Sequence, residues 1–299
     1  MPELRRRSLG FTLIEMSIVL VIIGLIIGGV LVGRDLIKAS EIRATVSQYE
    51  KYNSAVNTFY GKYGGLPADL VTASAQAYGF PWCTYTTQVG NGDGLITDRR
   101  GGVNQPEGEP LLFWPYLTVS QLVEGSYGVN LYPNNAAYPG INNNPGDPGW
   151  GSNPAGFYPT AKVRSKSYWL VGSNSGVNYY VLAGVNEWGL ASNGAYYTFN
   201  QSNALSPVEA FGIDSKVDDG LPNTGRVQAR VNFTGNSNNG GVDLLFTPLA
   251  ANTAGTFATT PASGTCQIGS SAATDPANTY AVGSASGSSP ACNLRLQFQ

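Results

Sequence analysis

Residues 10–15 read Gly-Phe-Thr-Leu-Ile-Glu, and residues 16–33, which follow directly, contain no charged side chain. As a helix, that apolar run would be about 27 Å long, close to the hydrocarbon thickness of a bilayer. Arginines fill positions 5–7, and basic flanking residues stay on the cytoplasmic side of a membrane. The sequence therefore predicts one membrane-spanning segment, with the chain after Arg34 outside the inner membrane. A generic signal anchor would explain this much.

The order of these segments carries more information than the apolar run itself. In an ordinary secretory signal the cleavage site follows the apolar core, so the core is removed. Here the site that fits, between Gly10 and Phe11, precedes the core, so a cleaved product would keep it. Glu15 lies at the edge of the run, where a carboxylate costs on the order of a few kcal/mol unless its charge is compensated. A basic leader, a Gly-Phe junction and this acid together resemble the class III signal of type IV prepilins and pseudopilins.

That resemblance implies how the precursor is processed. A prepilin peptidase would cleave after Gly10, removing residues 1–10 as a leader peptide. The same enzyme would methylate the new α-amino group, so Phe11 would become N-methylphenylalanine.

The resemblance also assigns roles in assembly. Glu15 would attract the N-terminal amine of a neighbouring subunit and set axial register, with Thr12 nearby; alternatively, the carboxylate simply rests among lipid headgroups. Gly24 matches the family's helix-loosening glycine. Val32 stands where major pilins usually carry proline, which favours a minor subunit.

The helix is expected to continue beyond the membrane as an amphipathic segment. Apolar residues recur there with helical spacing: Ile42, Val46, Tyr49, Val56, Tyr60 and Tyr63. Glycines at 61, 64 and 65 and a proline at 67 end the pattern near Tyr63. Residues 11–63 would form one helix about 80 Å long, membrane-spanning over 11–33. We expect the stripe to pack on the protein's own sheet, and the resemblance implies that the other side packs against neighbouring filament helices.

The predicted strands come late in the chain. Short aromatic or β-branched segments bounded by Gly, Asn and Ser span residues 168–171, 179–185, 196–200, 226–233 and 243–247. Ser206 and Glu209 form a capping box for a short helix over 207–217, which starts with proline. The strand spacing suggests an antiparallel meander. The predicted fold class is therefore α+β, with the long N-terminal helix packed on an antiparallel β-sheet head, residues 64–249.

A loop-rich insertion, residues 64–167, separates the helix from the sheet. So long a loop in a compact domain indicates a function or internal structure. Thr118 and Gln121 form a capping box that predicts a short helix over 119–124. Four aromatic residues are expected to be exposed there, either stacking on glycans or anchoring loops: Tyr132, Tyr138, Trp150 and Tyr158.

Part of the insertion resembles a calcium-binding loop. Asn91, Asp93 and Asp98 supply spaced oxygen ligands, with glycines for a sharp turn. However, the first ligand position falls on Val89 and the final bidentate acid on Arg100. A hydrogen-bonded Asn-Gly and Asp-Gly turn is the alternative. The sequence Asp-Asp-Gly at 218–220 is a second candidate, since some pseudopilins bind calcium in their heads.

Three cysteines fit an oxidising compartment. Cys266 and Cys292 lie in a Ser/Gly/Thr-rich C-terminal region, residues 250–299, and the family often closes its C-terminal variable region with a disulfide. The resemblance therefore favours a Cys266–Cys292 bond. Cys83 would be left over, either free and buried or paired with one of the others, because sequence alone cannot fix connectivity.

Composition excludes several function classes. The chain has no histidine, so a Ser-His-Asp or Cys-His arrangement is impossible and zinc lacks its commonest nitrogen ligand. We expect no enzymatic activity and, calcium apart, no cofactor. The formal net charge is −2, which argues against nucleic-acid binding because that requires a basic footprint.

The resemblance implies a structural subunit of a type IV pilus-like filament, either homo- or hetero-oligomeric. Its partners would be the prepilin peptidase, an inner-membrane assembly platform and, before assembly, membrane lipid. The precursor would cross the inner membrane once, with a cytoplasmic N-terminus, and the filament would be periplasmic or extracellular. Two alternatives stay open: a pseudopilin of a type II secretion system, and a filament-tip adhesin whose insertion binds a surface or a glycan.

Overall fold

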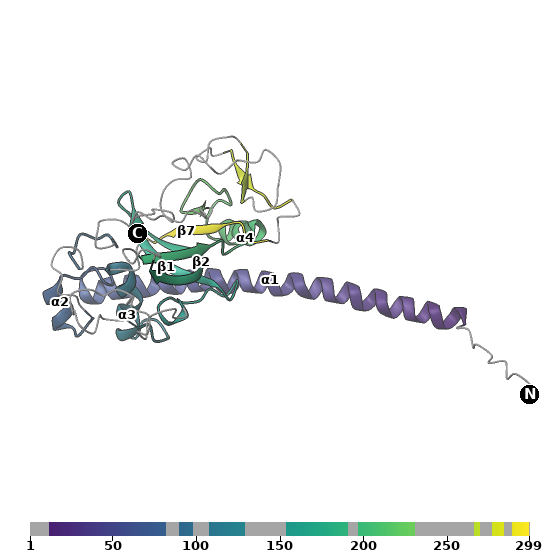
Figure 1. Cartoon of the computed structure of the whole chain (residues 1–299), viewed down its shortest axis with the longest axis horizontal. Helices are drawn as coiled ribbons and strands as arrows, with labels where there is room; N and C mark the ends of the chain where they lie inside the picture. Colours follow the sequence, from purple (N-terminus) through teal and green to yellow (C-terminus); the bar gives the residue numbers. More distant parts are fainter. Residues whose placement is uncertain are drawn as a thin grey trace, which may run out of the picture. The chain divides into compact units, whose positions relative to one another are not determined.

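The computed structural model describes residues 12–81, 90–97, 108–128, 154–190, 197–230, 266–269, 277–283 and 289–298 (Figure 1). The chain divides into two compact units, Met1–Glu41 and Ile42–Gln299. The first helix, α1 (Leu13–Tyr63), supplies residues to both units. Its bounds agree with the helix predicted over residues 11–63.

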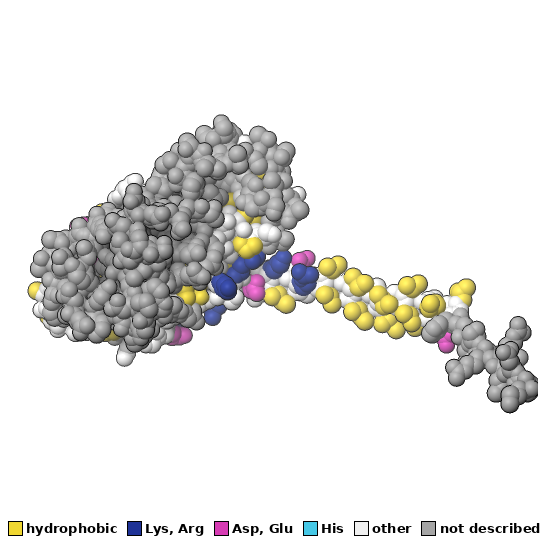
Figure 2. Space-filling model, viewed as in Figure 1, with side chains coloured by type: hydrophobic (Ala, Val, Ile, Leu, Met, Phe, Trp, Pro, Cys, Tyr) yellow, Lys and Arg dark blue, Asp and Glu magenta, His cyan; other side chains and the backbone are white. Residues whose placement is uncertain are grey.

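In the first unit, α1 is an uncovered apolar helix. The large apolar side chains between positions 16 and 32 are 46–73% exposed, and Figure 2 shows them along the helix, ending where Lys and Arg side chains begin. Among the described residues, α1 is the helix long and apolar enough to cross a membrane, with a mean hydropathy of 2.8 in its most apolar window. The expected membrane segment is thus present as a helix that its own chain does not bury.

In the second unit, one face of α1 is buried. Its buried residues are Ile42, Thr45, Tyr49, Tyr52, Ala55, Val56 and Phe59. This face contains Ile42, Tyr49 and Val56 of the predicted stripe. The prediction was wrong at Tyr60, which is 51% exposed, because Phe59 occupies the inward position of that turn. The helix ends at Tyr63, and the next residue, Gly64, has a φ of 77°, in the left-handed region that glycine tolerates.

The main sheet of the head has five antiparallel strands, in the order β1-β2-β7-β4 with β3 also paired to β2. Their bounds are β1 (Ser167–Asn174), β2 (Val177–Leu190), β3 (Tyr197–Ser202), β4 (Val227–Arg230) and β7 (Asn293–Gln297). Strands were predicted at β1 to β4, whereas the strand predicted over 243–247 lies outside the described residues. β7 was not predicted, and because it lies between β2 and β4, the expected meander was wrong.

Three smaller elements complete the C-terminal half. α4 (Pro207–Val217) has the predicted capping box, in which the Ser206 and Glu209 side chains each bond the other's backbone N–H. A two-stranded sheet pairs β5 (Gln267–Ile268) with β6 (Thr279–Tyr280).

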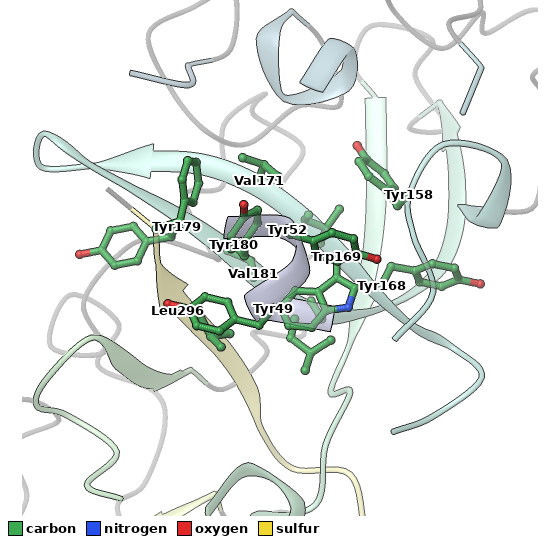
Figure 3. Packing of buried hydrophobic residues seen from close by; sticks show 14 of the residues in the cluster. Tyr49, Tyr52, Tyr158, Tyr168, Trp169, Val171, Tyr179, Tyr180, Val181 and Leu296 are labelled. Atoms are coloured by element: carbon green, nitrogen blue, oxygen red, sulfur yellow. The ribbon is translucent and has the colours of Figure 1, made fainter. Parts of the chain in front are cut away.

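The core between α1 and the sheet is mostly aromatic (Figure 3). Tyr52 of α1 meets Trp169 of β1 edge-on with ring centroids 5.8 Å apart, and Tyr49 meets Tyr180 of β2 at 6.0 Å. The Tyr49 hydroxyl also donates to the carbonyl of Gln297 at 2.7 Å. Edge-on aromatic pairs add about 0.5–1.5 kcal/mol each beyond their buried area, so these rings fix α1 against the centre of the sheet.

The insertion contributes to the same core. It contains α2 (Thr72–Ala77), α3 (Glu109–Val119) and a 3₁₀ turn, η1 (Pro154–Gly156). Every residue of α3 from Glu109 to Leu117 is buried. Tyr158, expected to be exposed, is also buried. The other three aromatic residues, Tyr132, Tyr138 and Trp150, lie outside the described residues.

The helix predicted over 119–124 was wrong, because α3 ends where that helix was expected to start. Thr118 lies inside α3, where its hydroxyl donates to the carbonyl of Pro115, and Ser120 is the C-cap. Gln121, expected to close a capping box, has a φ of 61°. The apolar residues before Thr118 form α3 despite Pro115. A capping pattern alone therefore does not distinguish the start of a helix from the turn that follows one.

Candidate functional site

The N-terminus of α1 holds the carboxylate of Glu15 in a fixed position. Its Oε2 atom accepts hydrogen bonds from the backbone N–H and the hydroxyl of Thr12, both at 2.8 Å. In return, the Glu15 backbone N–H donates to the Thr12 hydroxyl at 3.3 Å. This is a capping box: Thr12 caps the helix and turns the Glu15 side chain back toward the N-terminal end. Oε1 accepts no hydrogen bond from the described residues.

The other residues of the predicted N-terminal site have fewer contacts. Gly10 and Phe11 lie outside the described residues. Gly24 lies within α1, and a Cβ atom built on it would meet nothing within 4 Å. The chain's own packing therefore does not require glycine at position 24.

The residues predicted to bind calcium form a hydrogen-bonded turn. Asn91 accepts from the Asp93 backbone N–H at 2.9 Å and donates from its amide to the Asp93 carboxylate at 2.8 Å. Asp93 also accepts from the Leu95 backbone N–H at 2.8 Å. Asp98 lies outside the described residues. These bonds agree with the Asn-Gly and Asp-Gly turn that was the alternative, and calcium binding here stays a prediction.

Two buried carboxylates that the sequence analysis did not single out hold this turn on the head. Asp69 accepts from the backbone N–H groups of Gly92 and Gly94, each at 2.8 Å. Glu109, fully buried at the start of α3, accepts from Gly90 at 3.0 Å and from the Thr97 backbone at 2.7 Å. The local sequence gave no sign of these bonds, because donors and acceptors lie 12–25 residues apart.

Burial changes the titration of both acids. Removal from water raises the pKa of Glu109 to about 8 and that of Asp69 to about 6, while the backbone N–H donors oppose the rise in each case. The negative charge of the Asp69 carboxylate also raises the pKa of Glu109. Both carboxyls therefore titrate nearer to neutral pH than an exposed carboxyl does.

A third acidic group lies at the C-terminal end of α4. The carboxylates of Asp214, Asp218 and Asp219 each offer an oxygen within 4.8 Å of the others. Among the described residues, they form the group of acidic side chains close enough together to hold a metal ion. Their oxygens already accept hydrogen bonds: Asp214 from the Tyr280 hydroxyl at 2.7 Å, Asp218 from the Val227 backbone at 3.1 Å, and Asp219 from the Leu221 backbone at 2.8 Å. Burial raises the pKa of Asp214 to about 7. The hydrogen bonds of Asp214 and Asp218 thus connect the end of α4 to β6 and β4, and calcium binding at residues 218–220 stays a prediction.

The predicted disulfide between Cys266 and Cys292 is present. Cys292 directly precedes β7, and the backbone N–H groups of Ala204 and Leu205 donate to its carbonyl. The bond therefore attaches the segment before β5 to the middle of the main sheet. Cys83 lies outside the described residues.

Comparison with known proteins gives one match. The sequence model of one protein family, the prokaryotic N-terminal methylation motif, matches residues 5–31. No curated protein and no solved structure matches the chain. The match covers the three arginines of the leader, the Gly-Phe junction, Glu15 and most of the apolar run, and it does not extend into the head.

Proposed function

This chain is a type IV pilin-like protein, and we propose that it is a structural subunit of a type IV pilus-like filament. The observation that carries the proposal is the Glu15 carboxylate, bonded to Thr12 in the first turn of an apolar helix that the rest of the chain leaves uncovered. Such a helix needs lipid around it before assembly and other apolar helices around it afterwards. A single-pass inner-membrane precursor and a helix-centred filament meet these two needs.

Processing prepares the subunit for assembly. Cleavage between Gly10 and Phe11 by a prepilin peptidase removes the three arginines of the leader, and methylation modifies the new α-amino group. The cleaved chain then begins one residue before Thr12, the cap of α1. The apolar helix is kept, which is the property that distinguishes this signal from a secretory one.

Glu15 provides the contact that selects a processed neighbour. Thr12 occupies Oε2, and Oε1 is the oxygen that would receive the N-terminal amine of the adjacent subunit. Charge-assisted hydrogen bonds of this kind are about twice as strong as neutral ones. A carboxylate in an apolar environment is strongly destabilising if it is left unpaired. The amine exists only after cleavage, so an unprocessed chain cannot make the contact.

The same scheme names the partners and the location. Before assembly, the subunit lies in the inner membrane with a cytoplasmic N-terminus, in contact with lipid, the peptidase and an assembly platform. After assembly, its head lies on a filament in the periplasm or outside the cell.

Replacement of Glu15 tests the proposal. We expect Glu15→Ala to be inserted and cleaved normally but to reach sheared filaments severalfold less often than the wild type. Thr12→Ala, which loses both bonds that fix the carboxylate, should give a weaker defect. Glu124→Ala is the matched control, because this carboxylate is exposed and its pair with Lys51 at 3.1 Å is a surface ion pair of little energetic value. Normal incorporation of Glu15→Ala would refute the pairing.

A further inference from the structure

Four apolar side chains are exposed around the outer side of α4, and Phe211 connects them. A Cβ atom built on Gly220, the residue before Leu221, would be 3.3 Å from the Phe211 ring. The centroid of that ring is 6.1 Å from that of Tyr280, which comes two residues before Val282. The fourth side chain lies three residues before Phe211, on the same face of the helix. We call this set, whose members are 36–43% exposed, the α4 patch: Val208, Phe211, Leu221 and Val282.

The packing of the head does not account for the α4 patch. α4 packs on the head through its other side, where Ala210 and Ile213 are fully buried. A single exposed apolar residue is common on protein surfaces, whereas a contiguous apolar patch indicates a site of interaction. The α4 patch therefore needs an occupant from outside the head.

The chain holds this patch close to a membrane. A Cβ atom built on Gly212 would be 2.8 Å from the Ile42 side chain, so glycine at this position lets the α4 backbone come close to α1. Ile42 is the first residue of the second unit and comes nine residues after Gly33, the last residue of the uncharged run. Nine residues of helix measure about 13.5 Å. An apolar patch tethered at so short a distance from a bilayer meets lipid at a high local concentration, so a weak contact is enough to keep it bound.

The border of the α4 patch also suits a membrane surface. Lys216, in the last turn of α4, and Asp219, after the helix, are both exposed. A short helix with an apolar face and charged neighbours lies in the plane of the lipid headgroups, with its apolar face at the boundary of the acyl chains. Because the two border charges have opposite signs, the contact does not depend on anionic lipid.

We propose that the α4 patch lies on the periplasmic surface of the inner membrane before assembly, as a second membrane contact separate from the span of α1. The inference rests on the inner-membrane precursor of the proposed function. It gives the head its own part in that state, because the head is held against the bilayer by α4. Assembly breaks the contact when the subunit leaves the membrane.

Fluorescence quenching by lipid tests the contact. Val208→Cys in a Cys83→Ser background gives the full chain one free thiol for an environment-sensitive dye, since the disulfide of the C-terminal region stays closed. The labelled chain is reconstituted in phosphatidylcholine vesicles, with fewer chains than vesicles and with bromine on the lipid acyl chains. We expect the dye to be quenched severalfold more than at Tyr60→Cys, an exposed position of the head about 27 Å of helix beyond Ile42. Equal quenching at the two positions would overturn the proposal.

Two changes test the apolar nature of the contact. Phe211→Asp should lower quenching at Val208→Cys to the level at Tyr60→Cys, because it places a charge in the middle of the α4 patch. Raising the salt concentration should leave the quenching unchanged, since screening weakens contacts between charges and not apolar ones. Quenching that survives Phe211→Asp, or that salt removes, would contradict the proposal.

The same vesicles distinguish lipid from a second copy of the chain. A patch that binds a second copy would show no quenching in dilute vesicles, and its dye emission would move to shorter wavelength only as the ratio of chain to lipid rises. That result would overturn the proposal. A chain that does not stay with the vesicles would refute the membrane precursor of the proposed function itself. A chain that stays with them and is not quenched at Val208→Cys would refute only the contact of α4.

Discussion

The buried Glu109 carboxyl should make the stability of the head depend on pH. Its pKa of about 8 in the folded chain lies well above the ordinary value of 4.5. The folded state therefore binds the proton more tightly than the unfolded state. Stability from this group is fully present below about pH 4.5 and is lost as the pH rises through about 8. At 1.36 kcal/mol for each pKa unit, the difference is on the order of 3–5 kcal/mol.

Glu109→Gln removes that dependence and leaves most contacts in place. One amide oxygen can still accept a backbone N–H, but the amide nitrogen meets the other donor, from Gly90 or Thr97. The loss of that bond costs about 1–3 kcal/mol. At pH 5 the variant should therefore be less stable than the wild type. By pH 9 the difference should shrink or reverse, because the variant has no buried charge there.

The assay is urea unfolding of the full chain in detergent micelles from pH 5 to 9, followed by aromatic fluorescence. Burial also raises the pKa of Asp214, to about 7, so the free energy of unfolding of both proteins also depends on pH through Asp214. The quantity to compare is therefore the slope of the free energy of unfolding against pH in each protein. Glu50→Gln, at an exposed carboxylate, should leave the wild-type slope unchanged. Equal slopes for Glu109→Gln and the wild type would refute the reasoning.

Three further predictions concern stability and use the same unfolding assay at one pH. Phe59 is fully buried, with its ring 4.5 Å from that of Tyr63, so Phe59→Ala should cost about 3–5 kcal/mol. Tyr60→Ala, at the exposed neighbouring position, should cost under about 0.5 kcal/mol, and similar costs for the two would contradict the buried face of α1. Cys292→Ser should cost about 3–4 kcal/mol by the chain-entropy model, and the wild type in reductant should match it; no change would contradict the bond. Ser206→Ala should cost about 1 kcal/mol through loss of the α4 cap, and an unchanged midpoint would show that the capping box does not stabilise the head.

The sequence predicted α1, α4 and the strands β1 to β4 because their signals are local. The uncharged run, the periodic stripe and the glycines after Tyr63 set the limits of α1, and the Ser206 capping box set the start of α4. The inward side of α1 was harder to predict. Phe59 and Tyr60 are both aromatic neighbours, and only the shape of the core decides which of them turns inward.

The elements that were missed depend on partners distant in sequence. β7 contains Arg295 between two leucines, and a charged residue at that position is not typical of a strand in the middle of a sheet. Arg295 is accommodated because its side chain donates to Gln228 and lies 4.6 Å from the Tyr179 ring. The buried carboxylates of Asp69 and Glu109 were missed for the same reason. Their partners are backbone groups of a turn that lies far away in the sequence, and no local pattern places that turn beside them.

The claim that this chain is a processed filament subunit is tested most directly by intact-mass spectrometry of sheared surface filaments from the native host. The account predicts a species that begins at Phe11 and is heavier than the unmodified polypeptide by one methyl group. A chain that begins at Met1, or one cleaved after residue 33 so that the apolar helix is lost, would contradict it. The processed species confined to the membrane and absent from filaments would also contradict the pilus assignment, and it would indicate a secretion pseudopilin instead.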